Sequence, residues 1–184
     1  MQQHTKIFAY SAFFFLLGAF CVVALQAMEP KPIQANSAQL VISPPADEFY
    51  LGQITSANKS IDIMLYEFSY LPLKQALGKA VKKGTVVRVI LEPRVDSNLK
   101  TAGELSALGV SVKWASKEFA NTHAKTAAID GFKLIIGSTN WSQHAMKQNR
   151  EVSVLIESKA LTQQFLSIFE QDWKKAGEYK KRVK

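Results

Sequence analysis

Residues 122–140 read T-H-A-K-T-A-A-I-D-G-F-K-L-I-I-G-S-T-N. Two apolar runs rich in β-branched residues, 122–129 and 132–136, flank the dipeptide Asp130-Gly131. This dipeptide is typical of a two-residue hairpin turn, because both of its residues accept a positive φ. The pattern therefore predicts an antiparallel hairpin in which Asp130 and Gly131 are the central turn residues.

The predicted hairpin brings four chemically different side chains together. His123 lies opposite Ser138 in this register, and a one-residue shift of the turn would set His123 against Asn140 instead. His123 and Lys125 share a face of their strand because side chains alternate along it. An imidazole can attack phosphorus, while Lys125 and Asn140 can bind non-bridging phosphate oxygens, with Ser138 as a further donor. The sequence thus predicts phosphoryl transfer.

The spacing H-x-K-x4-D-x6-G-S-x-N of residues 123–140 resembles the HKD motif of the phospholipase D superfamily. The single copy in a short chain resembles the Nuc-type bacterial endonucleases in particular. Segment I-D-I-M-L-Y-E-F-S at 61–69 is similar to an early strand of the family, and Glu151 to its acidic residue after the motif. The resemblance implies an α-β-α sandwich and a metal-independent reaction through a phosphohistidine on His123. It also implies an active site built from two HKD copies and a hydrogen bond in which Glu151 accepts from a His123 ring nitrogen and fixes the orientation of the ring.

Two residues of the motif have structural explanations of their own. The position of Asp130 in the predicted turn explains this residue structurally. It is a candidate catalytic residue only because the HKD motif includes it. Gly137 is expected to let the backbone approach the phosphate or the opposite strand closely, which makes it a candidate binding residue. We expect no cofactor and no metal, because the ammonium of Lys125 beside His123 would repel a dication.

Apart from H-T-K at residues 4–6, in the N-terminal segment, the chain has no second H-x-K to supply the proton that a leaving oxygen needs. It contains three histidines: His4 lies in the N-terminal segment, and His144 is followed by Ala-Met-Lys. We therefore expect the second imidazole to come from a second subunit, in a homodimer with one shared site.

The N-terminus predicts an exported protein. An apolar run at 7–25 leads to Leu-Gln-Ala, so residues 1–27 are predicted to be a cleaved signal peptide, and the protein to be periplasmic or secreted. The alternative is an uncleaved segment that anchors the chain, because 7–25 is long enough to cross a bilayer. The only cysteine, Cys21, lies within it. Residues 28–44, with prolines at 30 and 32, are predicted to be a linker leading into a catalytic domain at 45–184.

The predicted elements alternate between helix and strand. Helices are expected at 45–58, 71–83, 97–108 and 161–179, strands at 61–66, 85–91, 110–114 and 151–156, and a helical turn at 141–147. Short crossovers favour parallel pairing and the hairpin is antiparallel, so the fold class is α/β with a mixed central sheet. Tyr66, Glu92 and Arg94 lie where the first two predicted strands end, so we expect them at the rim of the site.

The net positive charge of the chain favours a polyanionic substrate but does not indicate which one. Residues 28–184 carry 22 Lys and Arg against 15 Asp and Glu, a net charge of +7. Nucleic acid and an anionic membrane both suit such a surface. The leading expectation is a non-specific endonuclease acting on DNA or RNA, and the alternative is a phospholipase D-type lipid phosphodiesterase at a membrane. An idle nucleic-acid-binding protein is disfavoured because His123, Lys125 and Asn140 are all present.

Overall fold

The computed structural model describes residues 32–180. The predicted signal peptide at 1–27 and the apolar run at 7–25 lie outside this part of the chain. Within residues 32–180, no helix combines the length and the apolar character that crossing a membrane requires.

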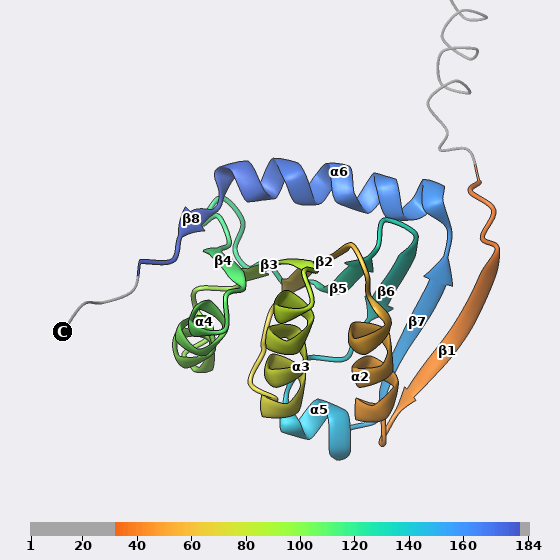
Figure 1. The fold of residues 1–184 in the computed structure, drawn as a ribbon, viewed down its shortest axis with the longest axis horizontal. Helices are drawn as coiled ribbons and strands as arrows, with labels where there is room; N and C mark the ends of the chain where they lie inside the picture. The colour runs from red at the N-terminus through yellow and green to blue at the C-terminus, as the bar shows by residue number, and fades with distance from the viewer. Residues whose placement is uncertain (1–31, 181–184) are drawn as a thin grey trace, which may run out of the picture. The chain divides into compact units, whose positions relative to one another are not determined.

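The described strands form a single eight-stranded mixed sheet in the order β1-β7-β6-β5-β2-β3-β4-β8 (Figure 1). The strands are β1 (Ser37–Ser43), β2 (Ser60–Leu65), β3 (Val86–Leu91), β4 (Ser111–Trp114), β5 (Lys125–Ile129), β6 (Lys133–Gly137), β7 (Glu151–Glu157) and β8 (Gly177–Glu178). Strands β2, β3 and β4 are parallel neighbours, and the other neighbouring pairs are antiparallel. The predicted α/β class with a mixed sheet is confirmed.

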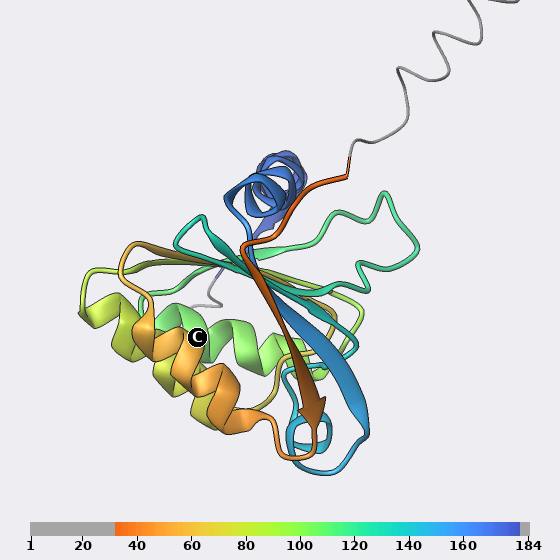
Figure 2. The same cartoon turned by 90° about the vertical axis from the view of Figure 1, so that its right-hand side faces the viewer.

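Helices cover both faces of this sheet. They are α2 (Asp47–Ser56), α3 (Leu71–Lys82), α4 (Ser97–Ala107), α5 (Gln143–Lys147) and α6 (Lys159–Lys175). Figure 2 shows α2, α3 and α4 on one face of the sheet and α6 on the other. Helix α6 begins where the Ser158 hydroxyl accepts the Leu161 N–H, and the loop after α3 turns at Gly84, whose φ is 95°.

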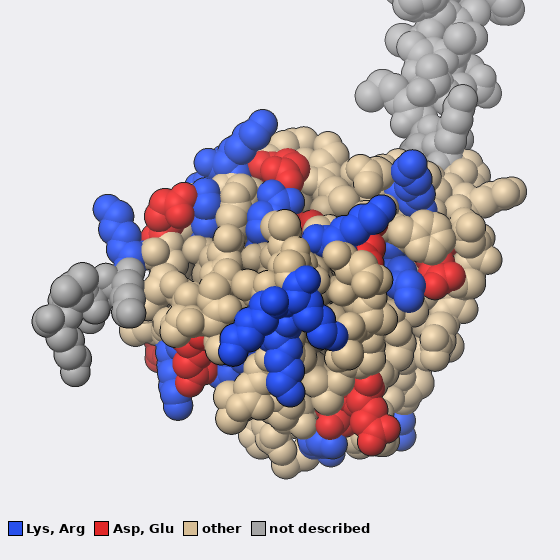
Figure 3. Space-filling model, viewed as in Figure 1, with Lys and Arg blue, Asp and Glu red and all other residues tan. Residues whose placement is uncertain are grey.

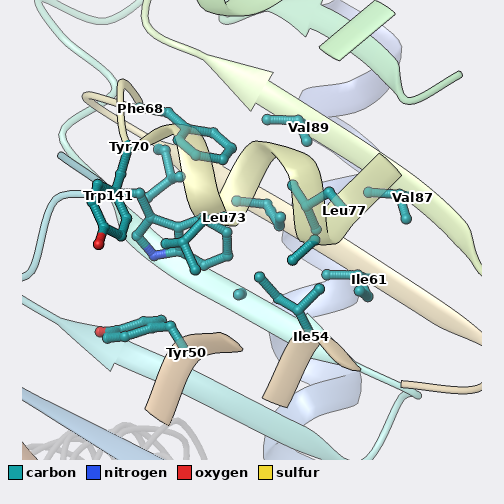
Figure 4. Packing of buried hydrophobic residues seen from close by; sticks show 14 of the residues in the cluster. Tyr50, Ile54, Ile61, Phe68, Tyr70, Leu73, Leu77, Val87, Val89 and Trp141 are labelled. Atoms are coloured by element: carbon teal, nitrogen blue, oxygen red, sulfur yellow. The ribbon is translucent and has the colours of Figure 1, made fainter. Parts of the chain in front are cut away.

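Strand β2 is buried along nearly its whole length. Ile63 belongs to a large cluster that includes Tyr50, Phe68 and Trp141, and Figure 4 shows these three side chains packed with residues of α2 and α3. The next residue, Met64, points to the other face and packs in a smaller cluster with Phe169 of α6. A central strand that is covered on both faces is buried on both, and the buried carboxylate of Asp62 in this strand is paired with Arg88 at 2.6 Å. Its carboxyl end is thereby held rigidly at the edge of the sheet where the motif residues lie.

Two predicted boundaries are wrong. Strand β1 occupies residues 37–43 of the predicted linker at 28–44, and it pairs antiparallel with β7. That partner lies more than a hundred residues further along the chain, so no local pattern indicates the pairing. The last predicted helix, 161–179, begins earlier and ends at Lys175, and the chain then forms the short strand β8 against β4.

Candidate active site

The motif hairpin forms as predicted but in a different register. Asp130 and Gly131 both have positive φ values, 54° and 68°. Ile129 nevertheless pairs with Lys133, so the loop contains a third residue, Phe132. The predicted register, with His123 opposite Ser138, and the shifted alternative are therefore both wrong.

Phe132 enters the loop because its backbone has other partners. Its N–H donates to Ile129 O at 3.1 Å and closes the turn, while its carbonyl accepts the Ser158 N–H at 3.0 Å. The hairpin is thus fastened to the start of α6. Each strand continues past the ladder to the opposite sheet edge, where the motif residues meet.

Asp130 lies at the far end of β5 from His123. Its carboxylate accepts the backbone N–H groups of Asn58, Lys59 and Ser60 at distances between 2.7 and 3.1 Å. Burial alone would raise the pKa of Asp130, but these three hydrogen bonds outweigh it and hold the pKa below its usual value. Asp130 therefore joins the hairpin to the start of β2 and is no longer a candidate catalytic residue.

His123 and Lys125 are in direct contact beside the carboxyl end of β2. Lys125 pairs with Leu65 at the end of the ladder, and the Tyr66 N–H donates to Ala124 O at 2.8 Å. The Lys125 Nζ lies 3.0 Å from Nδ1 and 3.1 Å from Nε2 of His123, and it also donates to His123 O at 2.9 Å. The Tyr66 ring lies 4.4 Å from the imidazole, centroid to centroid, and 5.0 Å from the Lys125 Nζ. Tyr66, predicted only to lie at the rim, therefore positions both functional groups.

The ammonium of Lys125 is partly stripped of water. The side chain is 9% exposed, and this burial lowers its pKa, while the carboxylates of Glu151 and Glu67 act in the opposite direction. A cation held in this way has few water partners to lose. A phosphate group arriving at the exposed His123 would meet it at little desolvation cost.

Glu151 contacts Ser138 and not the imidazole. The Ser138 hydroxyl donates to Glu151 Oε2 at 2.5 Å and accepts the Val152 N–H at 3.1 Å. Asn149 Nδ2 donates to the other carboxylate oxygen of Glu151 at 3.1 Å. The expected hydrogen bond from Glu151 to a His123 ring nitrogen is therefore wrong for this structure. Glu151 instead orients the hydroxyl of Ser138 and adds negative charge near Lys125.

Asn140 precedes Trp141, whose backbone is hydrogen-bonded to the residues that follow β2. The Trp141 N–H donates to Glu67 O at 3.1 Å, and Trp141 O accepts the N–H groups of Ser69 and Tyr70 at 2.9 and 2.8 Å. This backbone ladder fixes the position of Asn140. Its Oδ1 atom is buried and has no hydrogen-bond partner among the described residues, so the amide group is uncommitted within this part of the chain.

Gly137 is required by the close approach of β6 to β7. A Cβ atom at this position would come within 2.5 Å of Val152 O and closer still to Ser153. Of the two expectations for Gly137, approach to the opposite strand is the one that the structure confirms. The close contact brings Ser138 within reach of the Glu151 carboxylate.

A buried carboxylate at the end of β3 braces the loop that leads to His123. Glu92 is fully buried and accepts the Thr122 N–H at 2.7 Å and the Arg94 Nη1 at 2.8 Å. Arg94 also donates to Phe119 O at 3.1 Å. Burial would raise the pKa of Glu92, but the hydrogen bonds from Thr122 and Arg94 lower it. Arg94 therefore holds the loop in place and is not turned toward a phosphate.

Sequence reasoning missed Asn98, which ties this brace to β2. Its Oδ1 accepts the Phe68 N–H at 3.0 Å, and its Nδ2 donates to Tyr66 O at 2.8 Å and to Glu92 O at 2.9 Å. The side chain is fully buried. A polar residue in the first turn of a helix that follows a parallel strand was the available signal, but the sequence indicated only a helix start there.

Three neighbouring side chains are not part of the site. Trp141 is buried in the core, whereas Phe119 is 52% exposed on the braced loop. His144 is exposed on α5, where its Nδ1 lies 2.6 Å from Gln148 Oε1. Within residues 32–180, no three His, Cys, Asp or Glu side chains are grouped so that they could hold a metal ion.

Comparison with known proteins identifies the family. Residues 50–173 match the family model described as "Cardiolipin synthase, PLD-like domain". The chain belongs to the phospholipase D superfamily. The predicted family, and with it the enzyme class of phosphodiesterase, is confirmed at the level of the superfamily.

Relatives with similar sequences include a cardiolipin hydrolase and a phospholipase D. Mitochondrial cardiolipin hydrolase of Danio rerio is 32% identical over 126 residues, which cover 67% of this chain and 55% of the relative. Phospholipase D of Rickettsia conorii is 30% identical over 162 residues, covering 82% of this chain and 77% of that protein. The chain spans about half the length of the mitochondrial relatives that it matches.

Solved structures agree on the architecture. The phospholipase D family member Nuc from Salmonella typhimurium superposes with a TM-score of 0.74 at 26% identity, covering 79% of this chain and 99% of Nuc. NucT from Helicobacter pylori gives a TM-score of 0.69 at 18% identity, covering 78% and 99%, and shows the fold alone. The predicted resemblance to Nuc is thereby confirmed.

Proposed function

We propose that this chain is a metal-independent phosphodiesterase that hydrolyses nucleic acid with little sequence preference. The observation that carries the proposal is the contact between His123 and Lys125 beside the carboxyl end of β2. The Trp141 N–H bonds to Glu67 O just beyond that end and so brings the neighbouring Asn140 to the same end of the sheet. These groups supply a nucleophile and donors for phosphate oxygens in one place. The donors of the site are proposed to bind phosphate oxygens, which are the same at every nucleotide and carry no sequence information.

The proposed reaction has two displacement steps. A neutral His123 forms a bond to phosphorus while the bond from phosphorus to the leaving oxygen breaks, and a second imidazolium gives that oxygen a proton. Water then attacks the phosphohistidine, loses its proton to the second imidazole and releases His123. Lys125 would transfer its hydrogen bonds from His123 to the non-bridging oxygens, which frees a ring nitrogen to attack. Asn140 and Ser138 would donate to the same oxygens.

The second imidazole is proposed to be His123 of another copy of the chain. His144 is the other histidine among the described residues, and it is engaged with Gln148 on α5. A homodimer with one site shared about a two-fold axis would place two equivalent imidazoles on either side of the phosphorus.

Nucleic acid is the leading substrate, and phospholipid is the second. The net positive charge suits a polyanion, and Figure 3 shows a group of Lys and Arg side chains over α3 among scattered acidic ones. The superposition with Nuc covers 99% of Nuc and 79% of this chain. The names cardiolipin hydrolase and phospholipase D among its relatives favour the lipid alternative. The apolar run at 7–25 fits either proposed location, a secreted or periplasmic enzyme after cleavage or an enzyme anchored at a membrane.

The test is to incubate the purified protein with DNA, RNA and labelled phospholipid side by side in excess EDTA. His123→Asn should abolish cleavage of the true substrate, and His144→Ala should retain it as the matched histidine control. Cleavage of phospholipid alone would move the assignment to the lipid alternative. Cleavage of none of the three, or equal activity of wild type and His123→Asn, would refute the proposed function.

A further inference from the structure

A cavity of about 700 Å³ opens beside α4, β4 and β8, at the end of the sheet opposite β1 (Figure 1). Four apolar side chains line it: Pro93, Val95, Leu99 and Trp114. Leu99 is 57% exposed, and Trp114 packs partly buried against the main core cluster. We call this space the Trp114 cavity. Its size and its largely apolar walls are typical of ligand sites in proteins.

The Trp114 cavity and the motif residues lie along one edge of the sheet. Lys125 pairs with Leu65, and Leu65 pairs with Leu91. Leu91 in turn pairs with Trp114, so a single row of residues runs across β5, β2, β3 and β4. Neighbouring strands are about 4.8 Å apart, which places the Trp114 backbone about 14 Å from that of Lys125. This is the length of about four nucleotides at roughly 3.4 Å each, so a strand held at His123 can reach the cavity.

The wall of the Trp114 cavity is fastened to the loop that leads to His123. Pro93 lies between Glu92 and Arg94 in the chain. The Glu92 carboxylate accepts the Thr122 N–H at 2.7 Å and the Arg94 Nη1 at 2.8 Å. The same hydrogen-bonded brace therefore holds both the cavity wall and the residue before His123. A ligand in the cavity is thereby positioned relative to the imidazole.

The charged groups of the lining have different partners. Asp96 immediately precedes α4, and its carboxylate makes no capping hydrogen bond. Lys117 is exposed, and among residues 32–180 no carboxylate lies within 4.0 Å of its ammonium group. Lys175 is paired with Glu118 at 2.9 Å. Asp96 can thus accept the amino group of a base and Lys117 can bind a phosphate, while the apolar walls contact the ring.

We propose that the Trp114 cavity binds a nucleobase of the substrate strand, a few nucleotides from the phosphate that His123 attacks. This inference rests on the proposed function, because its ligand is part of a nucleic-acid substrate. Stacking on Trp114 suits every base, so the cavity adds affinity with little sequence preference. A lipid acyl chain would also fill the apolar walls, but it has no donor for the carboxylate of Asp96. The combination of an apolar wall, a free acceptor and a free cation therefore favours a nucleotide.

The test measures binding of single-stranded oligonucleotides to the full chain carrying His123→Ala, so that turnover does not consume the probe. Trp114→Leu should weaken binding of oligodeoxycytidine roughly fivefold or more, the loss expected for one stacked base. Leu99→Ala, which shortens the exposed wall, should weaken binding in the same direction. Neither variant should change the affinity for an abasic oligonucleotide of the same length. Ile168→Ala is the matched control, because Ile168 is 56% exposed on α6 and does not line the cavity.

Two further readouts locate the base. Oligodeoxycytidine should quench part of the tryptophan fluorescence, and this change should disappear in Trp114→Leu. The chain should bind oligodeoxycytidine more tightly than oligothymidine, because cytosine offers an amino group where thymine has a carbonyl oxygen. Asp96→Ala should remove this preference. Circular dichroism and the unfolding midpoint establish that each variant is folded, and Leu99→Ala tests the cavity even if Trp114→Leu does not fold.

The outcomes separate the cavity from the chemistry. Equal weakening for the abasic and the base-bearing probe, or cavity variants that bind like Ile168→Ala, would overturn the base site even if the wild type cleaves nucleic acid. If dodecyl phosphate changes the fluorescence of Trp114 and oligonucleotides do not, the cavity binds an acyl chain and the proposal is wrong. Base-dependent binding that requires Trp114, in a protein that cleaves no phosphodiester with His123 intact, would support the base site and refute the proposed function.

Discussion

Replacing Gly137 by alanine inserts one methyl group at the point where β6 and β7 approach most closely. The new Cβ would lie 2.5 Å from Val152 O and even nearer to Ser153. The obstructing atoms include backbone atoms of β7, which cannot move away without disturbing the pairing of Gly137 with Ser153. Overpacking typically costs about 1–3 kcal/mol, and we expect about 3 kcal/mol because the neighbours cannot rotate aside.

Gly52 provides a matched control for the same chemical change. It lies in α2, and a Cβ atom built there meets no heavy atom within 4 Å. Gly52→Ala should raise the free energy of unfolding by about 0.8–1 kcal/mol, since alanine is the better helix former. The two substitutions should therefore change stability in opposite directions.

The assay is urea denaturation and thermal denaturation, each followed by far-UV circular dichroism, with phosphodiesterase activity measured on the same protein. A loss of about 3 kcal/mol lowers the melting temperature by roughly 6–12 °C for a domain of this size, at about 2–4 °C per kcal/mol. Gly137→Ala should also lower turnover, because Ser138 and Glu151 lie beside the displaced strands. A Gly137→Ala protein with wild-type stability and turnover would refute the close-approach argument.

Three further predictions concern the chemistry, substrate binding and the turn. Excess EDTA should leave turnover unchanged, because Lys125 and Asn140 are proposed to neutralise the phosphate; loss on chelation with recovery on adding a divalent ion would contradict this. His123→Ala should abolish turnover but leave nucleic-acid affinity in a binding titration largely intact, because the basic surface survives; substantial turnover in this variant would make the nucleophile assignment wrong. Asp130→Ala should lose about 1–3 kcal/mol at neutral pH, measured by urea denaturation, while Asp130→Asn retains more by accepting one N–H and tolerating the positive φ. The pKa of Asp130 is lowered in the fold, so its contribution is present above the unfolded pKa of about 3.9 and is lost as the pH falls through the folded value. The difference between wild type and Asp130→Ala should thus shrink in acid, and a constant difference from pH 7 to pH 2 would count against it.

The parts of the fold that depend on local chemistry could be predicted from the sequence. Asp130-Gly131 specified a turn with two positive φ values, and both are present. The alternation of helices and strands indicated a mixed sheet, because short parallel crossovers and one antiparallel hairpin must share it. The contact of His123 with Lys125 follows from their position two residues apart in the sequence, although β5 begins only at Lys125.

The parts that depend on distant partners could not be predicted. Phe132 joined the turn because its carbonyl bonds to Ser158 at the start of α6, which shifted the hairpin register. Residues 37–43 form strand β1 because their backbone pairs with the free edge of β7. The carboxylate of Glu151 bonds to Ser138 and Asn149, and its choice among several neighbouring donors is a property of the packed site. In each case the deciding partner lies elsewhere in the sequence.

The most direct test of the shared site is to mix wild-type chains with His123→Ala chains at constant total protein and let the subunits exchange. If one intact His123 cannot complete the cycle, activity should fall as the square of the wild-type fraction, so an equal mixture should retain about a quarter of full activity. Mixing with His144→Ala, which leaves the site intact, should retain full activity and controls for the exchange itself. A linear fall, with about half of the activity at equal mixing, would show that each chain carries a complete site and would contradict the two-fold account.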